Sequence, residues 1–343
     1  MQHEITEQGL LLNSDGTLRE PGWARTPVLD YNRHSIKAPR LRIKEWDYYL
    51  IEDGEYAVAL TLSNLGYAGL LSVSVVDYAA RDVTTTSSIV PLPGSKIVVP
   101  TTSTEGISHY SSNRVSMFFD ATPERRILDV VMKKFSGKDT FVAHIELDEI
   151  PRDSMMIATP WPGGKHFYFN RKVVGMRAKG NFCVGDWTHE FKHEDSFGLL
   201  DWGRGVWPYS SRWFWGVAQG WQNDRVLAMN LGYGFGDTSA ASENMIFVDG
   251  ICHKLDKVDF GIPEKPDGSY DLMKTWHMTC NDDRLTLDFE PQIDCYDNIT
   301  LGVFVSNQHQ VFGELTGELV LDDGTVFPVT KMKAAVEVIR NKY

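Results

Sequence analysis

Short runs of alternating apolar and polar residues, separated by tight-turn residues, constrain the fold of this 343-residue chain more than any other feature. Successive side chains of a β-strand point to opposite faces, so this alternation predicts strands that are buried on one face. The chain contains five Asp-Gly pairs, two of which lie between such runs, and both residues tolerate the positive φ angles of two-residue hairpin turns. Asp249-Gly250, for example, lies between the strand-like runs Asn244–Val248 and Ile251–Leu255.

Most other segments also have strand character, and helical periodicity is scarce. Trp46–Glu52, Leu70–Tyr78 and Phe141–Leu147 are short and rich in β-branched and aromatic residues. Thr330–Ile339 is the one late helix candidate, and it fits a final strand equally well. The sequence therefore predicts an all-β protein with few short helices, built as two antiparallel sheets or two β-barrels.

A break in regular structure is expected between residues 149 and 164. Ile150-Pro-Arg-Asp-Ser is followed there by Thr159-Pro-Trp-Pro-Gly-Gly, and both Pro and Gly interrupt strands. This predicts two domains of ordinary size, residues 1–155 and residues 160–343. The second domain is expected to carry most of the ligand pocket.

Charge and hydropathy exclude two classes of function. Lys and Arg number 34 against 46 Asp and Glu, a net charge of −12, so the chain lacks the basic patch that nucleic acid requires. The uncharged segment Tyr56–Val76 is long enough for a membrane span, but Gly66 and Gly69 interrupt it. Two strands joined by a turn are expected there instead of a membrane span.

The cysteines and the first residues indicate the compartment. Cys183, Cys252, Cys280 and Cys295 show no Cys-x-x-Cys spacing, so neither a zinc ribbon nor a redox motif is indicated. Free thiols fit a reducing compartment. The residues after Met1 lack the charged region and apolar core of a signal peptide. A cytoplasmic location is therefore expected.

A Trp-rich segment from Asp201 to Trp221 is the first candidate for a ligand pocket. It holds five of the ten Trp residues, and its Gly and Pro residues favour a loop or a bulged strand. Asp201 and Arg204 lie among these rings. Because an unpaired buried charge is costly, we expect the two to pair with each other or with a ligand. The alternative is a structural ion pair beneath a Trp-rich core.

The second candidate is the run Leu231-Gly-Tyr-Gly-Phe-Gly236. A phosphate-binding loop needs a helix directly after it, and a strand is the next confident element, so no nucleotide cofactor is expected. The glycines instead leave a strand face that a ligand or another backbone can approach closely. Glu243-Asn244 then offers an acid/base carboxyl and an orienting amide. A turn in which Asp237 and Ser239 satisfy local backbone groups is an equal alternative.

The sequence His189-Glu-Phe-Lys-His193 matches the His-Glu-x-x-His pattern of zinc proteases. That chemistry needs both histidines on one face of a helix. The flanks are acidic and bounded by Gly, without an apolar helical stripe. A surface loop or a polar strand is therefore expected, and no metal site is predicted.

Several segments together resemble the bacterial family described as domain of unknown function 2804. They are Gly22-Trp-Ala-Arg25, Ile43-Lys-Glu-Trp-Asp-Tyr-Tyr49, Asp201-Trp-Gly-Arg-Gly-Val-Trp-Pro-Tyr209, Glu243-Asn244 before Asp249-Gly250, and Val311-Phe-Gly-Glu-Leu-Thr-Gly317 before Asp323-Gly324. That family is similar, more remotely, to the lipocalin-like tandem barrels of the AttH type, which include carotenoid 1,2-hydratases and pericyclase-type cyclases. The resemblance implies two successive lipocalin-like, calycin-like antiparallel β-barrels with a ligand cavity at or between their mouths.

The expected function is that of a cofactor-independent enzyme that uses acid/base chemistry on a small or medium organic ligand. The reaction would be a hydration, elimination, isomerisation or cyclisation. Glu243 or Asp201 would carry the proton, Arg204 would hold an anionic or carbonyl group, and Tyr209 and Asn244 would orient it. The other expected ligand-binding residues are Trp202, Trp207, Trp213, Trp215, Tyr233 and Asp237.

Two other classes of function remain open at this point. A carbohydrate-active enzyme would stack sugars on Trp rings and hold the Asp201 and Glu243 carboxyls about 5–5.5 Å or about 6.5–9.5 Å apart across an open cleft, whereas a closed apolar cavity favours the first class. A ligand-binding protein without turnover would have carboxylates that are all paired, with ordinary pKa values. The sequence also leaves open whether two copies form a homodimer.

Overall fold

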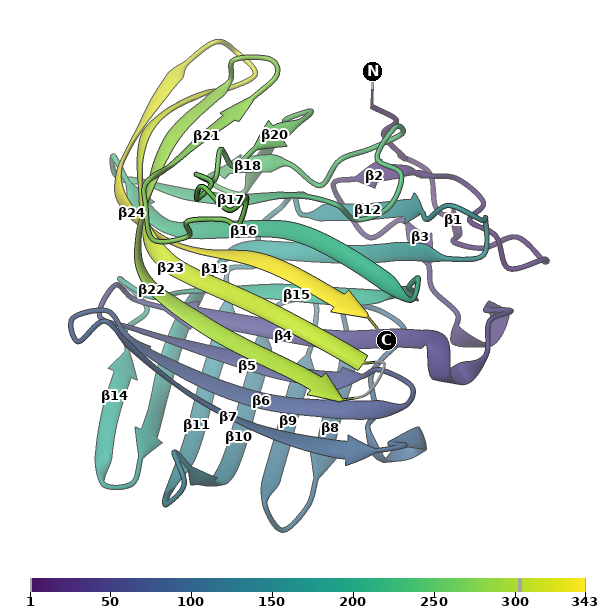
Figure 1. Cartoon of the computed structure of the whole chain (residues 1–343), viewed down its shortest axis with the longest axis horizontal. Coiled ribbons are helices and arrows are strands. Elements are labelled where there is room, and N and C mark those ends of the chain that lie inside the picture. Colours follow the sequence, from purple (N-terminus) through teal and green to yellow (C-terminus); the bar gives the residue numbers. More distant parts are fainter. Residues whose placement is uncertain (1, 302–303, 343) are drawn as a thin grey trace.

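The computed structural model describes residues 2–301 and 304–342, and strands dominate it (Figure 1). Two antiparallel sheets, each curled into a half-barrel, follow one another along the chain, with 13 and 9 strands. The helical segments of the described residues are the single 3₁₀ turns η1 (Arg33–Ser35), η2 (Arg40–Arg42) and η3 (Gly94–Lys96). The prediction of an all-β chain with few short helices is confirmed. No helix in the described ranges has the length and apolar character of a membrane span.

The first sheet takes its strands from the chain between Gly22 and Val206. Its main path runs β7–β6–β5–β4–β15–β13–β11–β10–β9–β8, while β12 and β14 also pair with β13, and β2 pairs with β12. The strands are β2 (Gly22–Ala24), β4 (Ile43–Glu52), β5 (Tyr56–Asn64), β6 (Ala68–Asp77), β7 (Asp82–Pro91), β8 (Gly106–Ser111), β9 (Val115–Ala121), β10 (Arg126–Phe135), β11 (Asp139–Asp148), β12 (Met155–Pro160), β13 (Phe167–Val184), β14 (Trp187–Phe191) and β15 (Phe197–Val206).

The second sheet takes its strands from the chain after Ser210. Its order is β19–β18–β17–β16–β24–β23–β22–β21–β20. The strands are β16 (Ser210–Gln222), β17 (Arg225–Tyr233), β18 (Met245–Val248), β19 (Ile251–Lys254), β20 (Val258–Asp259), β21 (Trp276–Cys280), β22 (Leu285–Leu301), β23 (Phe304–Val320) and β24 (Val326–Lys342). A separate parallel pair joins β1 (Gly9–Leu10) to β3 (Leu29–Asp30).

The hairpins lie where the turn residues predict them. The uncharged segment Tyr56–Val76 forms the antiparallel strands β5 and β6, with Gly66 at φ +84° in the turn. Asp249 and Gly250, both with positive φ, join β18 to β19. The segment Thr330–Ile339 is part of strand β24 and not a helix.

The change from one sheet to the other lies later in the chain than the expected division between residues 155 and 160. Strand β12 covers that stretch, and the Pro-Gly-Gly run after it forms the β12–β13 turn, where the Trp161 N–H donates to the His166 carbonyl at 2.9 Å. The chain leaves the first sheet between Val206 and Ser210. Pro and Gly serve a hairpin turn as well as a linker, so their presence does not mark a sheet boundary.

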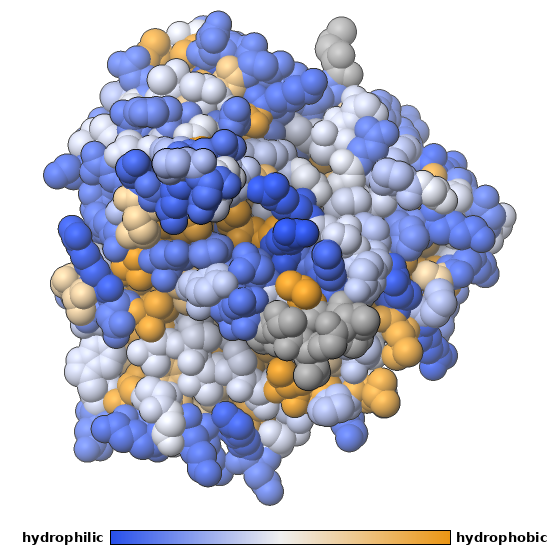
Figure 2. Space-filling model, viewed as in Figure 1, coloured by the Kyte–Doolittle hydropathy of each residue, from blue (hydrophilic) through white to orange (hydrophobic). Residues whose placement is uncertain are grey.

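Three apolar cores follow from the alternation of side chains along these strands. One core draws its residues from the first sheet, a second from the second sheet, and a third from both sheets together. On β4, Tyr49 and Ile51 enter the first core, while Trp46, Tyr48 and Leu50 enter the third. The third core is therefore the layer between the two sheets. On the face shown in Figure 2, hydrophilic side chains predominate and apolar residues lie in separate groups.

Candidate functional site

A buried ion pair lies in the layer between the sheets. Lys172 on β13 and Asp201 on β15 are cross-strand partners, and Nζ of Lys172 is 2.6 Å from Oδ2 of Asp201. The other carboxylate oxygen, Oδ1, accepts hydrogen bonds from Nδ2 of Asn170 at 2.6 Å and from Nε1 of Trp46 at 3.1 Å. The Lys172 side chain is 2% exposed and the Asp201 side chain 11%. Pairing offsets the desolvation that burial imposes on both charges.

Gly203 makes room for the indole that reaches this pair. Gly203 and Trp46 are direct cross-strand partners on β15 and β4. A Cβ atom on residue 203 would lie 2.0 Å from the Trp46 ring, so only Gly lets the ring cross over the strand toward Asp201. Gly203 therefore allows the Trp46 ring to pack against the ion pair.

Glu243 brings a second carboxyl into the same layer, from the loop before β18. Glu243 is 2% exposed, and its Oε2 accepts a hydrogen bond from the Tyr168 hydroxyl at 3.3 Å. Its Oε1 has no hydrogen-bond partner among the described residues, and a Cβ on Gly232 would lie 2.2 Å from that oxygen. Burial raises the pKa of Glu243 from 4.5 to about 7, with Lys172 lowering it and Asp201 raising it.

Glu337 on β24 is a third carboxyl of this layer. Its Oε2 accepts from Nε1 of Trp213 and its Oε1 from Nε2 of Gln310, each at 3.3 Å. The Gln310 amide also donates to the Tyr48 hydroxyl at 3.0 Å, which links the second sheet to β4 of the first. Burial raises the pKa of Glu337 to about 7, and Lys172 lowers it. Glu243 and Glu337 therefore both have a pKa of about 7, and the Lys172 ammonium lowers the pKa of each.

Aromatic rings surround these polar groups. The Trp215 ring lies 4.1 Å from the Lys172 ammonium, a cation–π contact across the two sheets. The Trp207 ring lies 5.1 Å from Trp213 and 5.5 Å from Trp161 between centroids. Nε1 of Trp161 and Nε1 of Trp207 are buried, and neither has a hydrogen-bond partner in the described part of the chain. The site thus combines apolar walls with two buried indole N–H groups that donate to no acceptor of residues 2–301 and 304–342.

The structure brings together five of the residues that the sequence singled out. All five lie in the layer between the sheets, although they come from both sheets and from two connecting segments: Asp201, Glu243, Trp207, Trp213 and Trp215.

The expected pair between Asp201 and Arg204 does not form. Side chains three residues apart on a strand point to opposite faces, and β15 is a regular strand here. Arg204 is 0% exposed, and its Nη2 lies 3.0 Å from Oδ1 of Asp47. Its guanidinium lies 4.1 Å from the Trp202 ring, and Trp202 belongs to the core of the first sheet. Arg204 and Trp202 are therefore structural residues on the far side of the strand.

The remaining predicted residues lie away from the ion pair or are engaged by backbone groups. Tyr209 is 46% exposed, and Asp237 is exposed and accepts from the Ser239 N–H. Tyr233 stacks on Phe214 at 4.6 Å in the core of the second sheet. Asn244 accepts from the Gly232 N–H at 2.6 Å and donates to the Asp256 carbonyl at 2.8 Å. Asn244 therefore holds the loop that carries Glu243.

The sequence analysis missed Lys172 and Glu337. Each is the one charged residue on its face of the strand segment around it. Lys172 lies within the buried run Phe167–Val174, and the partly exposed Glu337 follows the buried run Ala334–Val336. A charge at such a position is costly unless it has a partner, so the pattern itself is a signal of a buried polar site. The partners come from other strands, and the local pattern does not reveal them.

The two histidines of the His-Glu-x-x-His sequence do not lie on one helix. His189 is on strand β14 and its Nε2 lies 2.6 Å from Oδ2 of Asp53. His193 follows that strand, and its Nε2 lies 2.8 Å from Oδ1 of Asp148. Ligand atoms of Asp148, Glu149 and His193 lie within 4.8 Å of one another, but Asp148 is already paired with Lys179 at 2.9 Å. The expectation of a polar strand in place of a protease helix is confirmed for His189.

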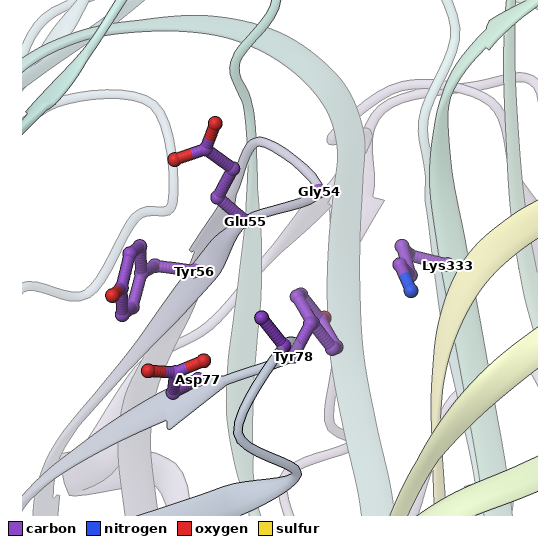
Figure 3. Close-up of a pocket in the computed structure, with 7 residues that line it drawn as sticks. Gly54, Glu55, Tyr56, Asp77, Tyr78 and Lys333 are labelled. Atoms are coloured by element: carbon purple, nitrogen blue, oxygen red, sulfur yellow. The ribbon is translucent and has the colours of Figure 1, made fainter.

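A cavity of about 390 Å³ lies farther along the junction of the sheets (Figure 3). Tyr78 and Lys333 face one another across it, with the Lys333 ammonium 4.6 Å from the ring, and Asp77 and Gly54 also line it. The Tyr78 hydroxyl donates to Oε2 of the buried Glu52 at 2.9 Å. Burial raises the pKa of Glu52 to about 7. This end of the layer therefore carries another carboxyl that titrates near neutral pH.

Comparisons with known proteins agree with this architecture. The family described as "Domain of unknown function (DUF2804)" matches residues 2–343. CghA is 13% identical, with a TM-score of 0.57 over 97% of this chain and 97% of its own. An AttH-like protein from Nitrosomonas europaea is 11% identical, with a TM-score of 0.55 over 90% of this chain and 94% of its own. Kievitone hydratase from Nectria haematococca is 10% identical, with a TM-score of 0.48 over 88% of both chains.

A comparison with curated proteins gives no match. At the identities found among solved structures, the likeness establishes the fold. The AttH-like fold that the sequence resemblance implied is thereby confirmed.

Proposed function

The chain belongs to the DUF2804 family, and from this premise and the buried carboxyls we propose that it is an enzyme of acid/base chemistry acting on a small organic ligand between the two sheets. The reaction class is hydration or its reverse, isomerisation or cyclisation. Each of these reactions moves a proton to or from an organic ligand and needs no electron transfer.

One observation carries the proposal: the Glu243 carboxyl is buried, has an oxygen without a hydrogen-bond partner among the described residues, and has a pKa of about 7. A carboxyl whose pKa is close to the working pH is present in both protonation states, so it can give or take a proton at low energetic cost. A structural carboxyl in the same place would be expected to have both oxygens satisfied. The free Oε1 is the atom that we assign to proton transfer.

The groups around Glu243 support proton transfer and stabilise the charge that it creates. Protonated Glu243 donates its proton from Oε1 to the ligand, and the resulting carboxylate then recovers a proton from water or from a ligand carbon, which restores the starting state. The Lys172 ammonium stabilises negative charge that develops during the transfer, because it acts on Glu243 and Glu337 alike. Asp201 and Asn170 position that lysine through the ion pair.

The aromatic walls define the ligand class. Trp161, Trp207 and Trp213 offer flat apolar faces, and the free indole N–H groups of the first two donate to an oxygen of the ligand. A site with such walls excludes water and strengthens the electrostatic interactions within it. A largely apolar ligand with one or two oxygen functions fits these walls.

The two alternative classes of function fit the site less well. Asp201 and Glu243 are both buried, whereas glycoside cleavage by a carboxyl pair needs an open cleft around the sugar chain. A carrier without turnover would have paired carboxylates with ordinary pKa values, and burial raises the pKa of Glu243 to about 7. Both observations support the acid/base enzyme.

The proposal is tested by incubating the protein with a mixed extract of bacterial small molecules in ¹⁸O-labelled water, followed by mass spectrometry. We expect depletion of at least one organic compound, with the appearance of an isomer or of a product heavier by one labelled water. The Glu243→Gln variant should lose this conversion, whereas Glu124→Gln, at an exposed turn, should retain it. Conversion that persists in Glu243→Gln would overturn the assignment of Glu243.

A further inference from the structure

A second cavity, of about 530 Å³, lies on the opposite face of the strands that carry the proposed site. Asn307 and His309 of β23 line it, together with Val338 and Arg340 of β24. Because side chains alternate along a strand, these residues point away from Glu337, the neighbour of Val338 that faces the other sheet. The cavity is therefore a separate feature of the second sheet, covered on one side by the loop that contains residues 265–273.

Two arginines lie directly opposite each other at this cavity. Arg212 on β16 and Arg340 on β24 are cross-strand partners, and both are exposed. Like charges directly opposite each other destabilise a sheet. Within the described ranges, neither guanidinium lies within 4.0 Å of a carboxylate, although the chain as a whole carries a net charge of −12. A third cation, Lys265, lies on the same cavity wall.

The two carboxylates that line the cavity already have side-chain partners. Asp294 lies 2.9 Å from Nδ1 of His309, and Asp271 lies 3.1 Å from Nζ of Lys274. Three cationic side chains, Arg212, Arg340 and Lys265, line the cavity with these two carboxylates. The lining therefore carries more positive than negative charge.

Part of the remaining wall is apolar and aromatic. The Arg212 guanidinium lies 5.1 Å from the ring centroids of both Phe214 and Tyr270, which orients it above the apolar surface. Leu272 and Val338 continue that surface. The volume is in the range of small-molecule sites, which combine apolar walls with a few polar anchors.

We propose that this cavity binds an organic anion, with its acidic group held between Arg212 and Arg340 and its aromatic or aliphatic body against Tyr270 and Leu272. A planar guanidinium donates two parallel hydrogen bonds to a carboxylate, phosphate or sulfonate, so two facing arginines suit any of these groups. Binding also removes the repulsion between the two cations. This inference is independent of the proposed reaction between the sheets.

The test compares two fluorescent probes of similar shape on the full-length protein. The anionic probe is 1-anilinonaphthalene-8-sulfonate, and the neutral probe is N-phenyl-1-naphthylamine, which lacks the sulfonate. Arg212→Gln combined with Arg340→Gln removes both anchors at exposed positions. Lys257→Gln combined with Lys331→Gln removes the same charge from exposed positions outside the cavity.

We expect one saturable site for the sulfonate probe, with a dissociation constant at least about tenfold larger in the double arginine variant, because that variant lacks the charge-assisted hydrogen bonds of both guanidinium groups. The dissociation constant of the neutral probe should differ by less than about twofold between the unmodified protein and the double arginine variant. The double lysine variant should bind both probes as the unmodified protein does. Displacement of the bound probe by benzoate or by phenyl phosphate then identifies the acidic group. Equal binding of the sulfonate probe by the unmodified protein and the double arginine variant would overturn the proposal, as would equal losses for both probes.

Discussion

Replacing Glu243 with Gln keeps the shape of the side chain and removes a buried group that titrates. Burial raises the pKa of Glu243 from 4.5 to about 7 in the folded protein, while the unfolded chain has an ordinary pKa. The folded state therefore holds this proton more tightly, and stability is lost as the pH rises from the unfolded pKa through the folded one. A rise of the pKa from 4.5 to about 7 corresponds to about 3 kcal/mol.

The assay is urea unfolding followed by Trp fluorescence and circular dichroism at a series of pH values between about 5 and 8. The unmodified protein should lose stability across this range, and Glu243→Gln should lose less, by up to about 3 kcal/mol. At the acidic end both proteins carry a neutral group at residue 243, so their stabilities should converge. Coincident transitions by the two probes are needed for the comparison, because the chain contains two sheets.

An unchanged pH dependence in Glu243→Gln would refute this reasoning, because the buried carboxyl would then not be taking up a proton between pH 5 and 8. The Glu124→Gln variant provides the matched control, since the same chemical change at an exposed position should leave the curve unaltered.

Two further substitutions test the packing and pairing of the site. Lys172→Met leaves the buried Asp201 carboxylate without its cation, which should cost about 3–5 kcal/mol of stability. Adding Asp201→Asn should recover most of that loss. Purely additive losses of the two substitutions in urea unfolding would contradict the pairing. Gly203→Ala places a Cβ 2.0 Å from the Trp46 ring and should lower the thermal midpoint, with a loss of about 1–3 kcal/mol. Gly9→Ala is the control, because no atom lies within 4 Å of its new Cβ, and it should leave the thermal midpoint unchanged. Equal thermal midpoints for Gly203→Ala and the unmodified protein would show that Trp46 does not cross the strand there.

The individual hairpins could be predicted, because the alternation of apolar and polar residues and the turn residues between the strands lie within one short stretch of sequence. Tyr56–Val76 illustrates this, since its apolar character suits a bilayer but its alternation and Gly66 produce a hairpin. The sheet boundary could not be predicted in the same way, because a Pro-Gly-Gly run has the same form in a hairpin turn as in a linker.

The candidate site could be predicted only in part, because its members meet through pairing between distant strands. The sequence identifies Asp201, beside Arg204 in a Trp-rich segment, and Glu243, after a Gly-rich run. The prediction for Arg204 is wrong because the glycines of its segment suggest an irregular loop. In the structure, Gly203 makes room for the Trp46 ring and Gly205 for the Phe167 carbonyl on a regular strand. Strand periodicity would have placed Asp201 and Arg204 on opposite faces. The lysine that pairs with Asp201 becomes visible only once β13 and β15 are aligned.

The measurement that tests the central claim most directly is the titration of Glu243 itself, by ¹³C nuclear magnetic resonance of the glutamate carboxyl carbons. The account predicts resonances with midpoints near pH 7, one of which is missing from the Glu243→Gln protein. Midpoints near 4.5 for every glutamate, or a variant that retains all of the resonances with midpoints near 7, would contradict it.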